Sequence, residues 1–133
     1  MIATVVSEIW KKLALNICTL PTAALLRFSA GQLIEHEPLV ELMKALLRET
    51  TEVANAKHIA LDFDERWDAI SSLLGRVGKA KPSMLQDVEA GRRTEIDVIN
   101  GAIVTAGQEV GVPTPRNETM VQLIRSQEAT FAR

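Results

Sequence analysis

The sequence predicts an all-α fold, a bundle of several helices that forms one domain over residues 1–133. Apolar residues recur at steps of three and four through most of the chain, and no segment shows the alternation typical of a strand. Prolines, glycines and helix-capping sequences separate these apolar runs. The length of 133 residues suits one domain and leaves little room for two.

The first expected helix begins near the N-terminus, and a proline should end it. Pro21 is expected to stop this helix because proline lacks a backbone N–H and its ring clashes with the preceding turn. A shorter helical run over 22–28 follows and breaks near Gly31. The apolar residues that define the first helix are Ile2, Val5, Val6, Ile9, Trp10, Leu13, Ile17 and Leu20.

Two further helices are expected in the middle of the chain. One runs from Pro38, which suits a first-turn position, to about Leu61. The next runs from Asp64 to about Gly75, and the stretch GRVGKAKP that follows is the clearest loop. The apolar side of the first of these helices carries Leu39, Leu42, Met43, Leu46, Leu47, Val53 and Ala54.

Two capping sequences divide the next part of the chain. Ser83 begins SMLQ, a capping box in which Gln86 should reach back to the start of its helix, and Gly91 interrupts that helix. Thr94 and Asp97 form a second possible box of the same type, which predicts a helix beginning at Thr94.

Glycine and proline mark the ends of the last two helices. Gly111 looks like the C-terminal cap of the helix that begins at residue 94, and the two prolines that follow prevent its continuation. Asn117 should cap a last helix that runs to about residue 131.

Composition and charge exclude several classes of function. A net charge of -2 gives no general attraction to nucleic acid or to a membrane surface, and 4% aromatic residues without tyrosine argue against a stacking platform for single strands. No segment is long and apolar enough to span a membrane, and no secretory signal begins the sequence. A cytoplasmic location is therefore expected.

Cysteine and histidine do not form a recognisable metal site. Cys18 lies in an apolar run and is interpreted as a buried, reduced thiol. His36 and His58 are far apart and have no cysteine partner, so we expect no metal and favour surface or packing roles for both. A glycine-rich phosphate loop after a strand is also missing from the sequence.

Two polar residues fall on one edge of the apolar stripe of the first helix. A projection at about 100° per residue places Lys12 and Asn16 on this edge, one turn apart, and points Lys11 into solvent. One alternative is a snorkelling lysine beside a boundary asparagine, which the pattern alone favours. The other is a partly desolvated ammonium that faces a cleft.

The helix expected from residue 94 carries a carboxylate on its apolar side. Asp97 projects away from that side, as a capping residue would, whereas Glu95 projects into it. An unpaired buried charge is costly, but a helix N-terminus or a lysine would reduce the cost. The alternative is that Glu95 tips outward, and helical geometry alone does not decide between the two.

Two longer motifs resemble those of a known family. SMLQDVEAGRRTEIDVINGAIVTAGQEVGVPTPRN resembles the signature stretch of the C-terminal domain of the ketopantoate reductase (2-dehydropantoate 2-reductase) family, and IWKKLALN resembles the family's helix that carries its catalytic lysine. Their order and spacing also match, and the resemblance covers essentially the whole chain. It implies a helical bundle of the 6-phosphogluconate dehydrogenase C-terminal-domain-like type.

The resemblance implies an NADPH-dependent oxidoreductase that acts on a 2-oxo acid, with ketopantoate of pantothenate biosynthesis as the family substrate. A preceding Rossmann domain, which this chain does not contain, would hold the NADPH. By position, Lys12 matches the general-acid lysine and Asn16 and Ser83 match substrate contacts. Glu95 matches the active-site glutamate, which could also contact the cofactor. An ammonium suits this role because it can stabilise and then protonate the oxygen that becomes negative when hydride reaches C2.

Two positions depart from the family pattern. Leu20 and Ala30 stand where the resemblance implies substrate-contacting asparagines. Each lost hydrogen bond would cost about 0.5–1.5 kcal/mol, so a less hydroxylated 2-oxo acid than ketopantoate becomes plausible.

Two functions from different classes follow from these observations. The first is the catalytic and substrate-binding half of such a reductase, inactive without its nucleotide-binding half. The alternative is a non-enzymatic helical module derived from such a reductase and retained for association. In either case we expect a homodimer, because an uncovered cleft face would expose apolar surface.

Overall fold

The computed structural model describes residues 2–131, and helices make up nearly all of its regular structure. No strand occurs among these residues, so the predicted all-α fold is confirmed. The α-helices are α1 (Ile2–Leu26), α2 (Glu37–Ala56), α3 (Phe63–Val77), α4 (Ser83–Glu89), α5 (Asn100–Val110) and α6 (Pro115–Glu128), and two short 3-10 helices are η1 (Gly31–Ile34) and η2 (Ile96–Val98).

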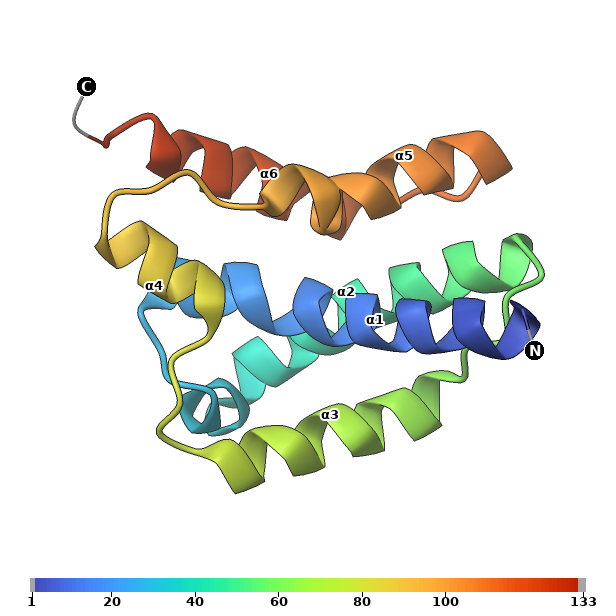
Figure 1. Cartoon of the computed structure of the whole chain (residues 1–133), viewed down its shortest axis with the longest axis horizontal. Coiled ribbons are helices and arrows are strands. Elements are labelled where there is room, and N and C mark those ends of the chain that lie inside the picture. Colours follow the sequence, from blue (N-terminus) through green and yellow to red (C-terminus); the bar gives the residue numbers. More distant parts are fainter. Residues whose placement is uncertain (1, 132–133) are drawn as a thin grey trace.

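The long helix α1 runs through the middle of the molecule (Figure 1). It contacts α2, α4 and α6, while α5 packs on α6 and α2. In Figure 1, α5 and α6 lie along one side of α1, α3 lies along the other, and α4 crosses one end. The core therefore surrounds the second half of α1, where residues 17–24 are all buried. Apolar burial of this kind is the main source of helix stability in globular proteins.

The prediction that Pro21 ends the first helix is wrong, because α1 continues to Leu26. Proline at position 21 cannot donate to the carbonyl of Ile17 four residues earlier. That carbonyl instead accepts from the side-chain Nδ2 of Asn100, at 3.2 Å. A distant side chain thus replaces the missing backbone donor. The separate helical run that we expected over 22–28 is the last part of α1.

The helices in the middle of the chain differ from their predicted bounds by only a few residues. Pro38 occupies the first turn of α2 as predicted, but α2 ends at Ala56 instead of near Leu61. His58 then adopts a positive φ of 64° and turns the chain toward α3. Helix α3 begins with Asp62, whose carboxylate accepts from the backbone N–H of Glu65, a local cap that the sequence analysis did not include.

The two predicted capping boxes are not formed. Pro82 is the N-cap of α4, Ser83 makes no capping hydrogen bond, and Gln86 donates to the carbonyl of Lys81 at 2.9 Å. The second segment does not begin a continuous helix at Thr94. It forms η2 and then α5, with a break at Ile99, and Asp97 pairs with Arg125 of α6.

The last two helices show one correct and one wrong capping prediction. Gly111 does end α5, with a left-handed φ of 72°, and its N–H donates to the carbonyl of Gly107. Asn117 is not the cap of α6, because that helix begins at Pro115 and Asn117 is fully buried in its first turn. The carboxylate of Glu49 in α2 caps α6 instead by accepting from the backbone N–H groups of Arg116 and Asn117.

Candidate functional site

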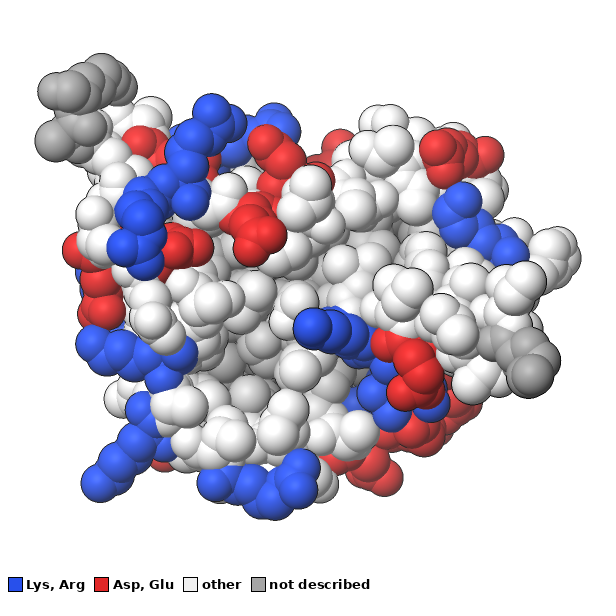
Figure 2. Space-filling view, in the orientation of Figure 1, with Lys and Arg blue, Asp and Glu red and all other residues white. Residues whose placement is uncertain are grey.

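A cleft of about 460 Å³ lies between α1 and the segment that leads from α4 to α5. The four residues selected from the sequence come from three separate stretches of chain, and the structure brings all four to this cleft. In Figure 2 the face shown is hollowed near its centre, where mostly uncharged atoms are visible. The lining residues are Ile9, Lys12, Leu13, Asn16, Leu20, Ser83, Glu95, Val98 and Ile99.

Helix α1 forms one wall of the cleft. Lys12 and Asn16 lie one turn apart on it, so they point to the same side. Lys12 is exposed and Asn16 is half-buried. Lys12 thus combines features of both alternatives, because it lines the cleft but is exposed, as a snorkelling lysine would be.

The other side of the cleft carries the hydroxyl of Ser83 and the carboxylate of Glu95. Both residues are exposed, Ser83 at the start of α4 and Glu95 directly before η2. Glu95 therefore does not point into the core, yet it still lines the cleft. Asp97 is exposed and paired with Arg125, outside the set of lining residues. Of the two neighbouring carboxylates, only Glu95 is placed to meet a ligand in the cleft.

Lys11 does not point freely into solvent, which corrects the sequence prediction. Its side chain is only 32% exposed and forms an ion pair with Glu8 at 3.1 Å. The reason is that α3 packs along this side of α1, so that Lys11 and Arg66 line the same groove. A helix with neighbours on more than one side has no single solvent face.

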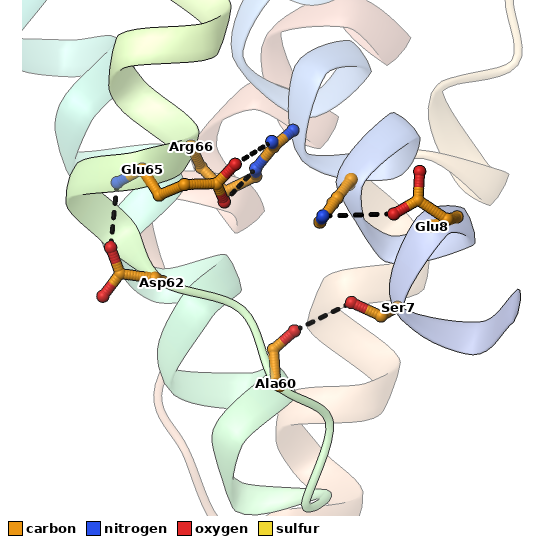
Figure 3. A network of polar contacts seen from close by, with 7 residues as sticks. Ser7, Glu8, Ala60, Asp62, Glu65 and Arg66 are labelled. Atoms are coloured by element: carbon orange, nitrogen blue, oxygen red, sulfur yellow. Dashed lines mark hydrogen bonds and ion pairs between the residues drawn. The ribbon is translucent and has the colours of Figure 1, made fainter. Parts of the chain in front are cut away.

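Figure 3 shows polar contacts near the beginning of α1 and of α3. The hydroxyl of Ser7 donates to the carbonyl of Ala60 at 3.1 Å, and Nε of Arg66 donates to the carboxylate of Glu65 at 3.0 Å. The Arg66 guanidinium lowers the pKa of Glu65 below its ordinary value through this hydrogen bond. The Ser7–Ala60 bond joins α1 to the loop before α3, whereas the Arg66–Glu65 contact lies within α3, and none of these residues lines the cleft.

Apolar side chains make up the rest of the cleft. Leu20 is nearly buried, at 9% exposure, whereas Ile9 and Val98 are exposed by 60% and 64%. Ala30, the other departure from the family pattern, is buried and lies outside the lining set; its N–H donates to the carbonyl of Ala80. Of the two departures, only Leu20 changes the lining of this cleft.

The chain matches the sequence family described as Ketopantoate reductase PanE/ApbA C terminal over residues 4–128. It belongs to the ketopantoate reductase C-terminal family. The 2-dehydropantoate 2-reductase of Streptococcus pyogenes serotype M6 is 34% identical over 128 residues, which are 96% of this chain and 42% of that protein.

Two solved structures of longer chains are similar to this ketopantoate reductase C-terminal domain. The PanE/ApbA family ketopantoate reductase from Ralstonia eutropha has a TM-score of 0.86 at 31% identity over 92% of this chain and 41% of its own. D-mandelate dehydrogenase, solved with NADH and anilino(oxo)acetate, has a TM-score of 0.90 at 28% identity over 94% of this chain and 41% of its own. The chain thus spans about two fifths of the proteins it resembles.

Neither a metal cluster nor a membrane helix is found in the described part of this ketopantoate reductase domain. Residues 2–131 contain no group of three or more histidine, cysteine, aspartate or glutamate side chains that could hold a metal ion. None of their helices is long and apolar enough to cross a membrane.

One feature of the site was missed by the sequence analysis. Behind the cleft, Glu49, Asn100 and Asn117 form a buried hydrogen-bonded chain that reaches the backbone of α1. No short motif signals it, because its members lie on three helices. The only available sign was that Asn100 and Asn117 occupy positions on otherwise apolar helix faces.

Proposed function

We propose that this chain is the substrate-binding and catalytic half of an NADPH-dependent 2-oxo acid reductase. The observation that carries the proposal is the meeting of Lys12, Asn16, Ser83 and Glu95 in one cleft. Membership of the ketopantoate reductase C-terminal family supports the reaction class. The dinucleotide would be held mainly by a Rossmann-type half, in the same polypeptide or in a separate one.

The polar residues suit the reduction of a carbonyl group. The cofactor supplies the hydride that adds to C2 of the 2-oxo acid. Lys12 would stabilise the negative charge that develops on the carbonyl oxygen and then give that oxygen a proton, which yields a 2-hydroxy acid. The amide of Asn16 and the hydroxyl of Ser83 can hold the substrate's polar groups. Glu95, at the edge of the cleft, would orient Lys12 or contact the cofactor.

The apolar lining favours a substrate with an apolar side chain. Leu20 is nearly buried in the wall and offers no hydrogen bond, so a substrate hydroxyl placed against it would lose its water without gaining a partner. We therefore propose a 2-oxo acid that is less hydroxylated than ketopantoate. The similarity to D-mandelate dehydrogenase with anilino(oxo)acetate agrees with a substrate other than ketopantoate.

The nucleotide-binding half would cover the side of the cleft at the start of α1. Ile2, Val5 and Ile9 follow one another at helical spacing and are 80%, 60% and 60% exposed. Val98, across the cleft, is 64% exposed. Interfaces between domains bury about 600–1,500 Å², and an uncovered apolar stripe beside a polar cleft fits such a contact. The same stripe also favours the second candidate function, a helical module that serves only association.

The test uses this chain joined to the nucleotide-binding half of the Streptococcus pyogenes relative. The joined protein should oxidise NADPH in the presence of a 2-oxo acid, and this chain alone should neither bind nor oxidise it. Lys12→Ala should lower kcat by about 100- to 10,000-fold, the usual contribution of a general acid, with a smaller change in KM. Lys11→Ala is the matched control, because Lys11 pairs with Glu8 and neither residue lines the cleft.

Two results would contradict the proposal. Unchanged kcat in the Lys12→Ala protein would remove Lys12 from the general-acid role. Reduction by none of a panel of 2-oxo acids, in a joined protein that binds NADPH normally, would favour the association module.

A further inference from the structure

Directly beneath the cleft, one backbone hydrogen bond of helix α1 is missing. Because Pro21 has no N–H, the carbonyl of Ile17 lacks its helical donor. Ile17 is fully buried and follows Asn16, which lines the cleft. A buried carbonyl without a partner is costly, so the group that donates to it in place of Pro21 contributes to holding the α1 wall.

Asn100 supplies that donor from the other wall. It is fully buried at the start of α5, and its Nδ2 donates to the carbonyl of Ile17 at 3.2 Å and to Oδ1 of Asn117 at 3.0 Å. Val98 and Ile99, which directly precede it, line the cleft. One side chain therefore connects the two walls by a hydrogen bond that spans 83 positions of sequence.

The orientation of Asn100 is fixed by a carboxylate. Oε1 of Glu49 accepts from Nδ2 of Asn117 at 2.8 Å, which turns Oδ1 of Asn117 toward Asn100. Asn100 must then present both N–H groups of its amide to acceptors, since the flipped amide would place oxygen against the carbonyl of Ile17 and against Asn117. Donation therefore runs outward from Asn100, to the carbonyl of Ile17 on one side and through Asn117 to the carboxylate of Glu49 on the other.

We propose that Asn100 is a positioning residue that fixes the separation of the two cleft walls, and with it the placement of Lys12 relative to Glu95. Lys12 belongs to the α1 wall and Glu95 to the segment that ends at Asn100. The consequence for turnover rests on the proposed reductase function, whereas the connection between the walls does not.

A double-mutant cycle with Pro21 tests the connection on this chain alone. Pro21→Ala restores a backbone N–H at the position that would donate to Ile17, so the bond from Asn100 becomes redundant. Asn100→Ala should therefore lower the folding equilibrium constant about five- to ten-fold more in the parent than in the Pro21→Ala background. Losses that agree within about two-fold in both backgrounds would overturn the connection.

A measurement without substitution covers the case in which Asn100→Ala does not fold. The two Nδ2 protons of Asn100 in the parent protein should exchange with water far more slowly than the side-chain amide protons of exposed Gln108, as seen by NMR. Exchange at the rate of Gln108 would overturn the proposal. Asn100→Ser, which keeps one shorter donor, should lie between the parent and Asn100→Ala in stability.

Measurements of amide exchange and of turnover test the positioning role of Asn100. Asn100→Ala should speed amide exchange in residues 12–20 and 95–99, and Leu74→Ala, a core substitution in α3, should not do so selectively. In the protein joined to a nucleotide-binding half, Asn100→Ala should lower kcat about ten-fold or more, with an unchanged KM for NADPH. Pro21→Ala should return stability to the Asn100→Ala protein but not that kcat, because it pairs the Ile17 carbonyl within α1 without rejoining the two walls. A kcat restored together with stability would overturn the positioning role.

The two proposals fail separately. Normal kcat for Asn100→Ala in an active enzyme would overturn the positioning role and leave the reductase intact. Absence of turnover in the unsubstituted joined protein would overturn the reductase, and the exchange pattern in residues 12–20 and 95–99 would then decide whether Asn100 positions the walls.

Discussion

Removal of the Glu49 carboxylate should destabilise the whole bundle, although Glu49 lies far in sequence from everything it bonds. Its two oxygens accept from the backbone N–H of Arg116 at 2.9 Å, the backbone N–H of Asn117 at 3.1 Å and Nδ2 of Asn117 at 2.8 Å. Helix α6 has no side-chain cap of its own at Thr114. Glu49→Ala thus removes a helix cap and leaves a buried amide without an acceptor.

The magnitude follows from these two losses. Loss of an N-terminal cap costs about 0.5–2 kcal/mol, and a buried donor left unpaired costs about 1–3 kcal/mol. The sum, about 1.5–5 kcal/mol, is a large part of the roughly 5–15 kcal/mol that stabilises a typical domain. Glu49→Gln should cost less, because an amide oxygen can keep the bonds made by Oε1 and loses only the bond to Arg116.

Urea denaturation followed by tryptophan fluorescence and circular dichroism measures this difference. Trp10 in α1 and Trp67 in α3 report on helices other than α6, so a cooperative loss of stability should appear in both signals. The control is Glu52→Ala, an exposed glutamate on the same helix, which should change stability by less than about 0.5 kcal/mol. A Glu49→Ala protein as stable as Glu52→Ala would refute the capping argument.

Three further predictions concern the thiol, the cleft and association. Burial raises the pKa of Cys18 from 9.0 to about 12, so the folded thiol should resist alkylation. The contribution of this shift to folding stability is complete below pH 9.0 and is lost as the pH rises toward 12. Cys18→Ala should therefore flatten the decline of stability over this pH range in urea titrations. Leu20→Asn in the joined enzyme should raise kcat/KM for ketopantoate relative to 2-oxoisovalerate by about 2- to 13-fold, the value of one hydrogen bond, and an unchanged ratio would remove Leu20 from substrate selection. Sedimentation of this chain at tens of micromolar should show a dimer, whereas a 14.6 kDa monomer at every concentration would contradict association.

Helical periodicity predicted the fold class because it reflects local geometry repeated along the chain. The apolar stripe of α2 and the left-handed glycine at position 111 were both recognised in this way. The end of α1 was not, because its continuation past Pro21 depends on a donor at Asn100 that the local sequence does not contain. A proline rule assumes that no distant group replaces the lost hydrogen bond.

Capping was predicted poorly for the same physical reason. The sequence offered nearby partners for Thr94 and Asn117, but the structure gives both of them glutamates from other helices. Glu128 bonds Thr94 across 34 positions, and Glu49 bonds Asn117 across 68. A local capping sequence competes with every carboxylate that folding brings near, and that competition is invisible before the helices are packed.

For the candidate site, projection and resemblance contributed different information. Projection placed Lys12 and Asn16 on one edge of a helix but could not say what faced them. The resemblance selected Ser83 and Glu95 as their companions, and the fold brings all of these to the same cleft. Lys11 was placed wrongly because a projection assumes one packed side, and α3 supplies a second.

The exposure of Lys12 explains why the apolar stripe of α1 matters for the proposed reaction. At about 4 Å an ammonium and an oxyanion attract by roughly 1 kcal/mol in water but by roughly 4 kcal/mol at the effective dielectric constant of a partly covered protein surface. Within this chain the ammonium faces solvent, so it would stabilise the transition state weakly. A partner that packs on Ile2, Val5 and Ile9 would cover the stripe and exclude water from the adjoining cleft. Docking of the second half would then complete the site electrostatically as well as supply the cofactor, and the residues that bind the partner need not touch the substrate to affect kcat.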